Sequence, residues 1–208
     1  MNKQTGFTLV EIAIVMVIIG LLLGGVLKGQ QIILDAKLKN LENQFQGTIA
    51  AYYTYLDRYS ALAGDHQDAR VKILFGTNVG GGDGNRKIAT GNTIHLFDST
   101  TTNQESRLFW LHLRNAGLVS GAPTDQNQPA NPFGGVIGVS TGDATTTPSI
   151  RELFVGFSNI PRDSAVIIDL RRDDGNEGTG SVQATPISGS TTGNYGNTES
   201  PYNMFFKM

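Results

Sequence analysis

The chain contains no cysteine among its 208 residues. Without a thiol it can form no disulfide, no thiolate metal site and no cysteine nucleophile. It also has no excess charge of one sign, because 16 lysines and arginines stand against 18 aspartates and glutamates, for a formal net charge of −2. This balance argues against a nucleic-acid-binding field over the whole surface, and it leaves room only for a local basic patch.

Few sequence features suggest catalysis. There is no His-Glu-x-x-His zinc motif, and His66, His95 and His112 are scattered along the chain. The glycine-rich residues 80–85 are not followed by Gly-Lys-Ser/Thr, so they predict a flexible loop rather than a phosphate cradle. We therefore expect no enzymatic activity.

The chain does have a long apolar run near its start. Residues 7–27 form a stretch of 21 residues in which Glu11 carries the only charge. As a helix this stretch would be about 31 Å long, which matches a hydrocarbon core of about 30 Å. A secretory signal would have a shorter apolar region with its cleavage site after it, whereas the plausible cut here comes before the run, after Gly6. The run predicts one membrane-spanning helix, and Lys3 favours a cytoplasmic N-terminus, although Lys28 on the other side weakens that bias.

Glu11 is energetically costly in such a helix. A charged side chain at the centre of a spanning helix costs about 2.5–3.5 kcal/mol on insertion scales, and less near one end. A group of this kind usually has a partner of opposite charge; the alternative is a carboxylate that reaches back to the headgroup layer. The segment therefore looks built for more than anchoring.

Residues 6–11, Gly-Phe-Thr-Leu-Val-Glu, together with the apolar run, resemble the type III prepilin signal of type IV pilins and type II secretion pseudopilins. The resemblance covers roughly the first quarter of the chain. It implies that a prepilin peptidase cleaves between Gly6 and Phe7 and methylates the new amine of Phe7. It also makes Glu11 the family's fifth-position glutamate, which would pair with its own terminal amine or with that of a neighbouring subunit.

The same resemblance implies a structural filament subunit, of a type IV pilus-like filament or a type II secretion pseudopilus. The implied partners are identical or homologous pilin subunits, the prepilin peptidase, an inner-membrane assembly platform, and membrane lipid before assembly. The implied location is the bacterial inner membrane, crossed once, and then a periplasmic or extracellular filament. The alternative is a minor pilin that acts in recognition, through DNA uptake, adhesion or binding of a secretion substrate. For nucleic acid, the nearest cationic cluster is Arg70, Lys72, Arg86 and Lys87, which a solvated loop explains equally well.

Beyond the apolar run, hydrophobic residues recur every three or four positions and so mark one face of a helix. They are Leu34, Leu38, Leu41, Phe45, Ile49, Tyr52 and Leu56. We predict one helix from residue 7 to about residue 59, roughly 80 Å long, whose stripe is covered by a downstream domain rather than by a coiled-coil partner. Glycines weaken helicity near the membrane exit, at Gly20, Gly24, Gly25 and Gly29. Related subunits unwind there at a proline that this chain lacks, so unwinding at the glycines is a hypothesis.

The expected fold is α+β, with the long helix packed on a small antiparallel β-sheet. We divide the chain into a leader (residues 1–6), a transmembrane and assembly helix (7–27), an amphipathic helix (28–60) and a globular α+β domain (61–208). Within that domain, Gly64 is the expected stop of the long helix. Three strand candidates are residues 136–139, 153–157 and 180–185.

Shorter helices are predicted at residues 68–75, 102–113 and 161–171; the alternative for the last segment is a strand at residues 165–170. The second of these is expected to begin with a capping box from Thr102 to Glu105, and the third with Pro161 in its first turn. Residues 187–203 are rich in Ser, Thr, Gly and Asn, so we expect disorder in their middle. Phe205 and Phe206 should then pack back onto the sheet.

The most charged turn of the chain follows the last predicted helix. Oxygen donors surround a glycine there, which is what a Ca²⁺ loop needs: Asp173, Asp174, Asn176 and Glu177. Some pseudopilins bind calcium in a C-terminal loop, which supports this interpretation. The spacing is not that of an EF-hand, and Arg171 and Arg172 can neutralise the carboxylates, so a solvated turn is the alternative. Many pilins hold this region with a disulfide, so packing or a bound cation must replace it here.

Overall fold

The structure is a computed structural model that describes residues 8–88, 97–142, 150–188, 194–196 and 200–208. The chain divides into two compact units, residues 1–39 and residues 40–208. Four helices and four strands follow one another along the described residues in the order α1-α2-α3-β1-β2-α4-β3-β4.

Helix α1, Leu9–Tyr59, is a single helix of 51 residues, which confirms the predicted long helix. The four glycines from Gly20 to Gly29 lie inside it without ending it. In the first unit its large apolar side chains are exposed; Leu21, for example, is 73% exposed. Among the described residues, α1 is the one helix long and apolar enough to cross a membrane.

The part of α1 that belongs to the second unit packs against a core. Its buried face includes Leu41 and Phe45 from the predicted stripe and also Tyr55, which was not in that stripe. The Phe45 ring lies 5.1 Å from that of Phe206. The helix ends because Ser60 adopts a left-handed conformation, with φ 51°. Gly64, the stop that we expected, lies beyond this end in a tight turn.

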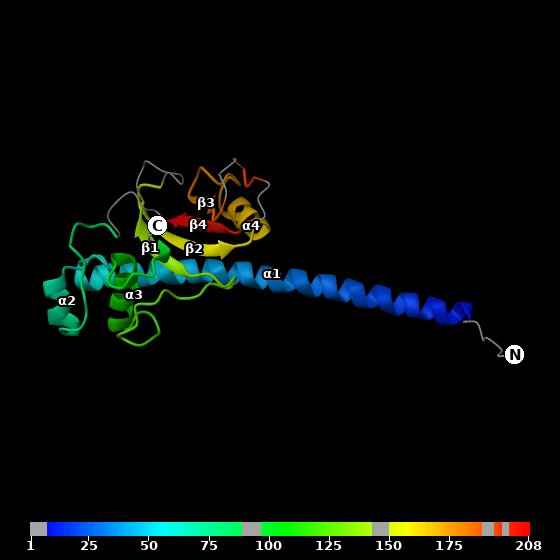
Figure 1. Cartoon of the computed structure of the whole chain (residues 1–208), viewed down its shortest axis with the longest axis horizontal. Helices are drawn as coiled ribbons and strands as arrows, with labels where there is room; N and C mark the ends of the chain where they lie inside the picture. The colour runs from blue at the N-terminus through cyan, green and yellow to red at the C-terminus, as the bar shows by residue number, and fades with distance from the viewer. Residues whose placement is uncertain (1–7, 89–96, 143–149, 189–193, 197–199) are drawn as a thin grey trace. The chain divides into compact units, whose positions relative to one another are not determined.

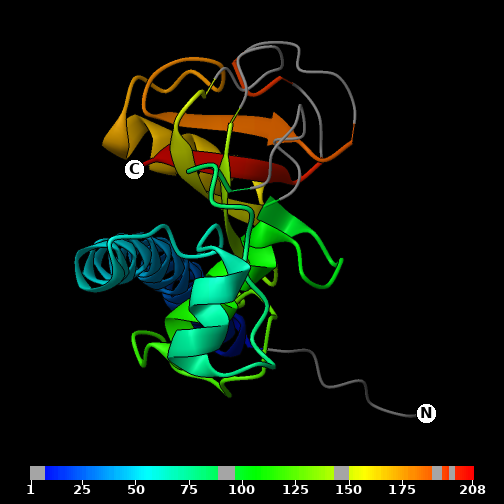
Figure 2. The same ribbon diagram turned by 90° about the vertical axis from the view of Figure 1, so that its left-hand side faces the viewer.

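The sheet is antiparallel and has four strands in the order β1-β2-β4-β3 (Figure 1). Strands β1 (Ile137–Thr141), β2 (Leu153–Ile160) and β3 (Val182–Pro186) correspond to the three strand candidates. The α+β fold, with α1 against a small antiparallel sheet, is confirmed. Figure 2 shows the end of this unit at which α2 lies.

Strand β4, Tyr202–Lys207, is the element that the sequence did not reveal. Phe205 and Phe206 do not pack onto the sheet from outside; they belong to β4, which pairs with β2 on one side and β3 on the other. Phe205 faces Phe97 and Phe154, at centroid distances of 5.5 and 5.3 Å. The last strand in the sequence therefore lies inside the sheet. Of the tail whose middle we expected to be disordered, residues 189–193 and 197–199 lie outside the described part of the chain.

The three short helices are confirmed as α2 (Asp68–Phe75), α3 (Glu105–Asn115) and α4 (Arg162–Arg172). The predicted capping box of α3 is wrong. That helix begins at Glu105, its N-cap residue Gln104 makes no side-chain cap, and Glu105 Oε1 instead accepts a hydrogen bond from the backbone N–H of Asp83 at 3.2 Å.

The glycine-rich loop at residues 80–85 is packed, so the prediction of a flexible loop is wrong. A Cβ on Gly81 would lie 2.3 Å from Asp68 Cα, and one on Gly82 would lie 2.5 Å from Asp65 Cα. Because no side chain fits at these distances, the glycines allow the backbone of the loop to pack directly against the segment before α2. The loop needs glycine for close packing rather than for phosphate binding.

Candidate functional site

The described part of the N-terminal signal begins at Thr8, so Gly6 and Phe7 lie outside it. Thr8 and Glu11 form a reciprocal capping box at the start of α1. Glu11 Oε2 accepts hydrogen bonds from the backbone N–H and the hydroxyl of Thr8, both at 2.9 Å, and Thr8 Oγ1 accepts one from the Glu11 N–H at 3.3 Å. We missed this box in the sequence, although Thr-x-x-Glu before an apolar run is its signature.

The box determines where the Glu11 carboxylate points. It lies at the first turn of α1, against the backbone of Thr8, which is the residue after Phe7 in the sequence. The predicted partner of Glu11 is the amine that cleavage would create on Phe7. The carboxylate is therefore held at the same end of the helix as that amine.

The C-terminal turn uses its oxygen atoms mostly for its own backbone. Asp173 Oδ2 accepts hydrogen bonds from the N–H groups of Ser181 and Val182. The side chain of Asp174 accepts from the Thr179 hydroxyl at 2.6 Å and from the Asn176 N–H at 2.9 Å, and these bonds lower the pKa of Asp174. These contacts are those of a structured Asx-type turn.

Of the four candidate calcium ligands, the structure brings two together and adds a third residue. One oxygen each from Asp169, Asp173 and Asp174 lies within 4.8 Å of the others. Asp169 is fully buried, and among the described residues its Oδ1 accepts no hydrogen bond. Burial raises the pKa of Asp169, and the hydrogen bonds from the Tyr195 hydroxyl and the Gly175 backbone offset this only in part. A buried, unsatisfied carboxylate oxygen beside two more carboxylates is a donor set that fits a hard divalent cation.

The other two candidates point elsewhere. Asn176 Oδ1 accepts the Gly178 N–H at 3.1 Å, and Glu177 Oε2 accepts the Tyr195 N–H at 3.0 Å. Asp169 was not among the predicted ligands, although its position four residues before Asp173 at the end of α4 is a signal that could have identified it.

Tyr195 links several segments of the C-terminal region through buried contacts. Its ring is buried, its hydroxyl donates to Asp169 Oδ2 at 2.7 Å, and its carbonyl accepts from Arg162 Nε at 2.7 Å. With the bond to Glu177, it joins α4, the charged turn and the tail before β4. Tyr195 therefore provides the packing that we expected to replace the missing disulfide.

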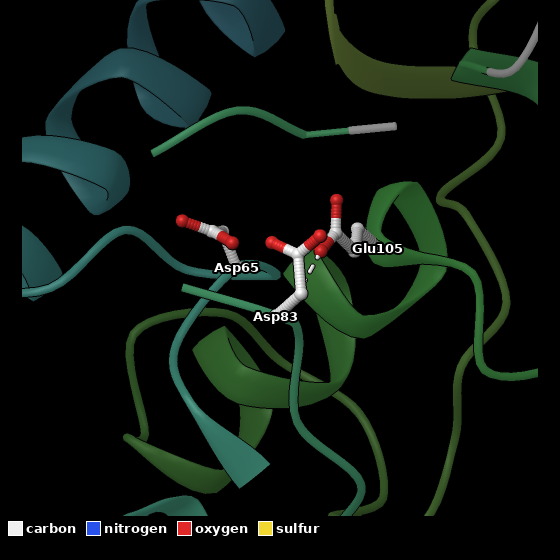
Figure 3. Close-up of side chains that lie close together, drawn as sticks. All are labelled: Asp65, Asp83 and Glu105. Atoms are coloured by element: carbon white, nitrogen blue, oxygen red, sulfur yellow. Dashed lines mark hydrogen bonds between the residues drawn. The ribbon is translucent and has the colours of Figure 1, made fainter. Parts of the chain in front are cut away.

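A second acidic group lies beside the glycine-rich loop, where Asp65, Asp83 and Glu105 point toward one another (Figure 3). Asp65 is buried, and burial raises its pKa. Its two oxygens accept the backbone N–H groups of Gly84, Asn85 and Arg86 at 2.7, 3.0 and 2.6 Å. Asp65 thus anchors the loop, and this group has a structural explanation.

The histidines form no catalytic arrangement among the described residues; His95 lies outside them. His112 Nδ1 accepts the Gly64 N–H at 2.9 Å, so its Nε2 carries the proton and donates to the Gly80 carbonyl at 2.8 Å. Burial lowers the pKa of His112 to about 4. His66 Nδ1 lies 2.9 Å from the Tyr55 hydroxyl. Both rings act as structural connectors.

Comparison with known proteins identifies one segment of the chain. Residues 1–27 match the model of the prokaryotic N-terminal methylation motif, the prepilin-type cleavage and methylation signal of type IV pilins and pseudopilins. Proteins with this motif are structural substrates of the prepilin peptidase that assemble with other pilins, and they are not an enzyme family. Neither the curated proteins nor the solved structures gave a significant match.

Proposed function

We propose that this chain is a structural subunit of a type IV pilus-like filament or a type II secretion pseudopilus. It crosses the inner membrane once, is cleaved after Gly6, is N-methylated at Phe7, and enters the filament through a bundle of α1 helices. The observation that carries this proposal is the methylation motif at residues 1–27, which runs directly into a helix of 51 residues with an exposed apolar first part.

The energetics favour an assembly role for Glu11. A lipid bilayer and a bundle of apolar helices are similarly hydrophobic, so little transfer free energy is available to set the register of one helix against the next. An ion pair between Glu11 and a methylated terminal amine would be strong in that apolar setting, and leaving either charge unpaired would be costly. The capping box supports this role because it holds the carboxylate at the end of the helix where the amine would lie.

Calcium is the cofactor that we propose for the C-terminal turn. The donor set is revised from the sequence prediction to Asp169, Asp173 and Asp174. The buried Oδ1 of Asp169, which accepts no hydrogen bond from the residues that the structure describes, supports the proposal. A cation there would balance three adjacent carboxylates at the end of α4 and would reinforce the Tyr195 contacts.

Recognition of nucleic acid is the weaker alternative. Of the four cationic residues that suggested it, Lys72 forms an ion pair with Asp68 at 2.6 Å and is thereby partly neutralised. Arg70 and Arg86 line the same cavity. Two arginines are a small basis for the strong phosphate contacts that such binding requires.

The test is to express the full chain with its assembly system and to purify the fibres. Electron microscopy should show filaments, and mass spectrometry should find a terminal peptide that begins with N-methylated Phe7. A matched variant, Gly6→Val, should stay uncleaved and should yield no filaments. Fibres made of chains that begin with unmethylated Met1 would contradict the proposal.

A further inference from the structure

Two cavities lie side by side at the end of the second unit where α2 is found. One has a volume of about 400 Å³ and is lined by residues that include Leu56, Arg70 and Arg86. The other has a volume of about 340 Å³ and is lined by residues that include Tyr59, Arg70 and Ile73. They share His66 and Arg70, so the two hollows form one continuous surface.

This surface combines exposed apolar side chains with arginines that have no ion-pair partner among the described residues. Ile73 is 83% exposed and Leu74 is 48% exposed. In the described part of the chain, the guanidinium groups of Arg70 and Arg86 form no ion pair and no hydrogen bond. Asp65, which also lines the larger cavity, is already occupied by three backbone N–H groups. We call Arg70, Ile73, Leu74 and Arg86 the α2 patch.

Helix α4 carries an apolar patch of the opposite charge. Leu170 is 62% exposed, and the side chain of Asp163 is 88% exposed. These residues are seven positions apart, so they lie on one face of the helix, with Val166 and Ile167 half-buried between them. The neighbouring Arg162 neutralises Asp163 only weakly, at 3.4 Å, because its Nε is turned to the Tyr195 carbonyl. We call Asp163 and Leu170 the α4 patch.

The two patches lie at opposite ends of the second unit, as the positions of α2 and α4 in Figure 1 show. They cannot meet within one copy. A filament that grows by repetition of one contact needs a heterologous interface, in which two different and complementary surfaces of the same chain meet. A surface that combines exposed apolar side chains with arginines and an apolar helix face that ends in an aspartate are complementary in this sense.

We propose that the α2 patch of one copy binds the α4 patch of the next copy in the filament. Leu170 would enter the smaller cavity beside Ile73, and Asp163 would pair with Arg70 or Arg86. This inference rests on the proposed function, because it names the contact between neighbouring globular domains. The partner is a second copy of this chain.

The absence of native cysteine makes the proposal directly testable. Fibres of the full-length chain that carries both Ile73→Cys and Leu170→Cys should give a ladder of covalent multimers on mild oxidation. Each single variant should give none, since the interface joins different surfaces. The pair Ser120→Cys with Leu170→Cys, which places one cysteine on an exposed loop outside both patches, should also give none.

The outcomes separate this proposal from the proposed function. Fibres without a ladder, or an equal ladder from the Ser120 control, would overturn the contact and leave the filament role intact. Failure of the unsubstituted chain to form any fibre would instead count against the filament role. If the first cysteine pair prevents assembly, the pair Arg86→Cys with Asp163→Cys provides the same test at the polar rim.

A charge exchange gives an independent measurement. Asp163→Arg alone should lower the cross-linked fraction about 1.5- to fivefold, the size expected for one exposed ion pair. Combining it with Arg70→Glu and Arg86→Glu should restore cross-linking, because the charges again match. Equal losses in the single and combined variants would argue against a direct charge contact.

Discussion

The Tyr195 hydroxyl donates a hydrogen bond of 2.7 Å to Asp169 Oδ2, and both residues are buried. They lie 26 positions apart in the sequence, on the tail and on α4. Together with the bond from the Tyr195 N–H to Glu177, this contact fastens the C-terminal region of a chain that has no disulfide.

Replacing Tyr195 by phenylalanine should destabilise the fold by about 1.5–3 kcal/mol, because a buried carboxylate loses its hydrogen-bond donor. Chemical denaturation of the full chain in detergent would measure the loss. The exposed Tyr53→Phe is the matched control and should change stability by less than about 0.5 kcal/mol. Equal stability of the two variants would show that the hydroxyl contact is not important.

Calcium should raise the thermal midpoint of the full chain. A ligand present at 100 times its dissociation constant stabilises the state it binds by about 2.7 kcal/mol. Asp169→Asn should abolish the response because it removes a charged donor from the set, whereas Asp83→Asn, in the other acidic group, should keep it. Identical midpoints in calcium and in chelator for the unsubstituted chain would dismiss the site.

His112 should make the fold sensitive to acid. Its folded pKa is about 4, below the ordinary value of 6.5, so its contribution to stability is present above pH 6.5 and is lost as the pH falls toward 4. At pH 5 the loss should be roughly 2 kcal/mol. His66 lies next to it, and burial lowers the pKa of that residue as well, so the neighbour adds to the effect.

The measurement is the urea midpoint at pH 7 and pH 5 for the unsubstituted chain and for His112→Gln. The variant is expected to be less stable at pH 7, because a glutamine cannot reproduce both bonds of the ring. It should show a smaller loss between the two pH values. An unchanged difference would mean that other groups cause the acid sensitivity.

Substitutions can separate the two roles of Glu11, which are capping of α1 and the proposed ion pair. Glu11→Gln can keep the capping box, since glutamine also caps at this position, but it removes the charge. Thr8→Ala removes the box and keeps the charge. If the ion pair sets the register, Glu11→Gln should lose most of the fibre yield and Thr8→Ala only a part, as counted by electron microscopy against total chain. The reverse order would show that capping matters more than charge.

Two adjacent glycines test the packing of the loop before α3. Gly81→Ala should lower the free energy of unfolding by about 1–3 kcal/mol, because its Cβ would lie 2.3 Å from the backbone of Asp68. Gly80→Ala is the control, since the nearest atoms to its Cβ are side-chain atoms at 3.6 Å. Similar midpoints for both variants would contradict the close packing of the loop.

The fold was largely predictable where local signals are strong. Helix α1, the three short helices and strands β1, β2 and β3 all coincide with periodicity or turn residues within their own segments. Strand β4 was missed because its six residues follow a Gly- and Ser-rich stretch, and its place between β2 and β3 depends on partners far away in the sequence.

The candidate sites likewise could be predicted where their residues are neighbours in the sequence, and not where they come from distant segments. The methylation motif could be recognised because its residues are contiguous, and the comparison confirms it over residues 1–27. The acidic group was only partly predicted: the turn supplied Asp173 and Asp174, but the burial of Asp169 and its contact with Tyr195 depend on how the tail folds over α4.

The sequence by itself determined the prepilin-type signal and the long apolar helix, because both are read from neighbouring residues and a fixed helical period. Only the tertiary structure decided how the C-terminal region is held without a disulfide, and which carboxylates meet. The physical reason is that buried hydrogen bonds between distant segments exist only after the chain has folded and excluded water from them.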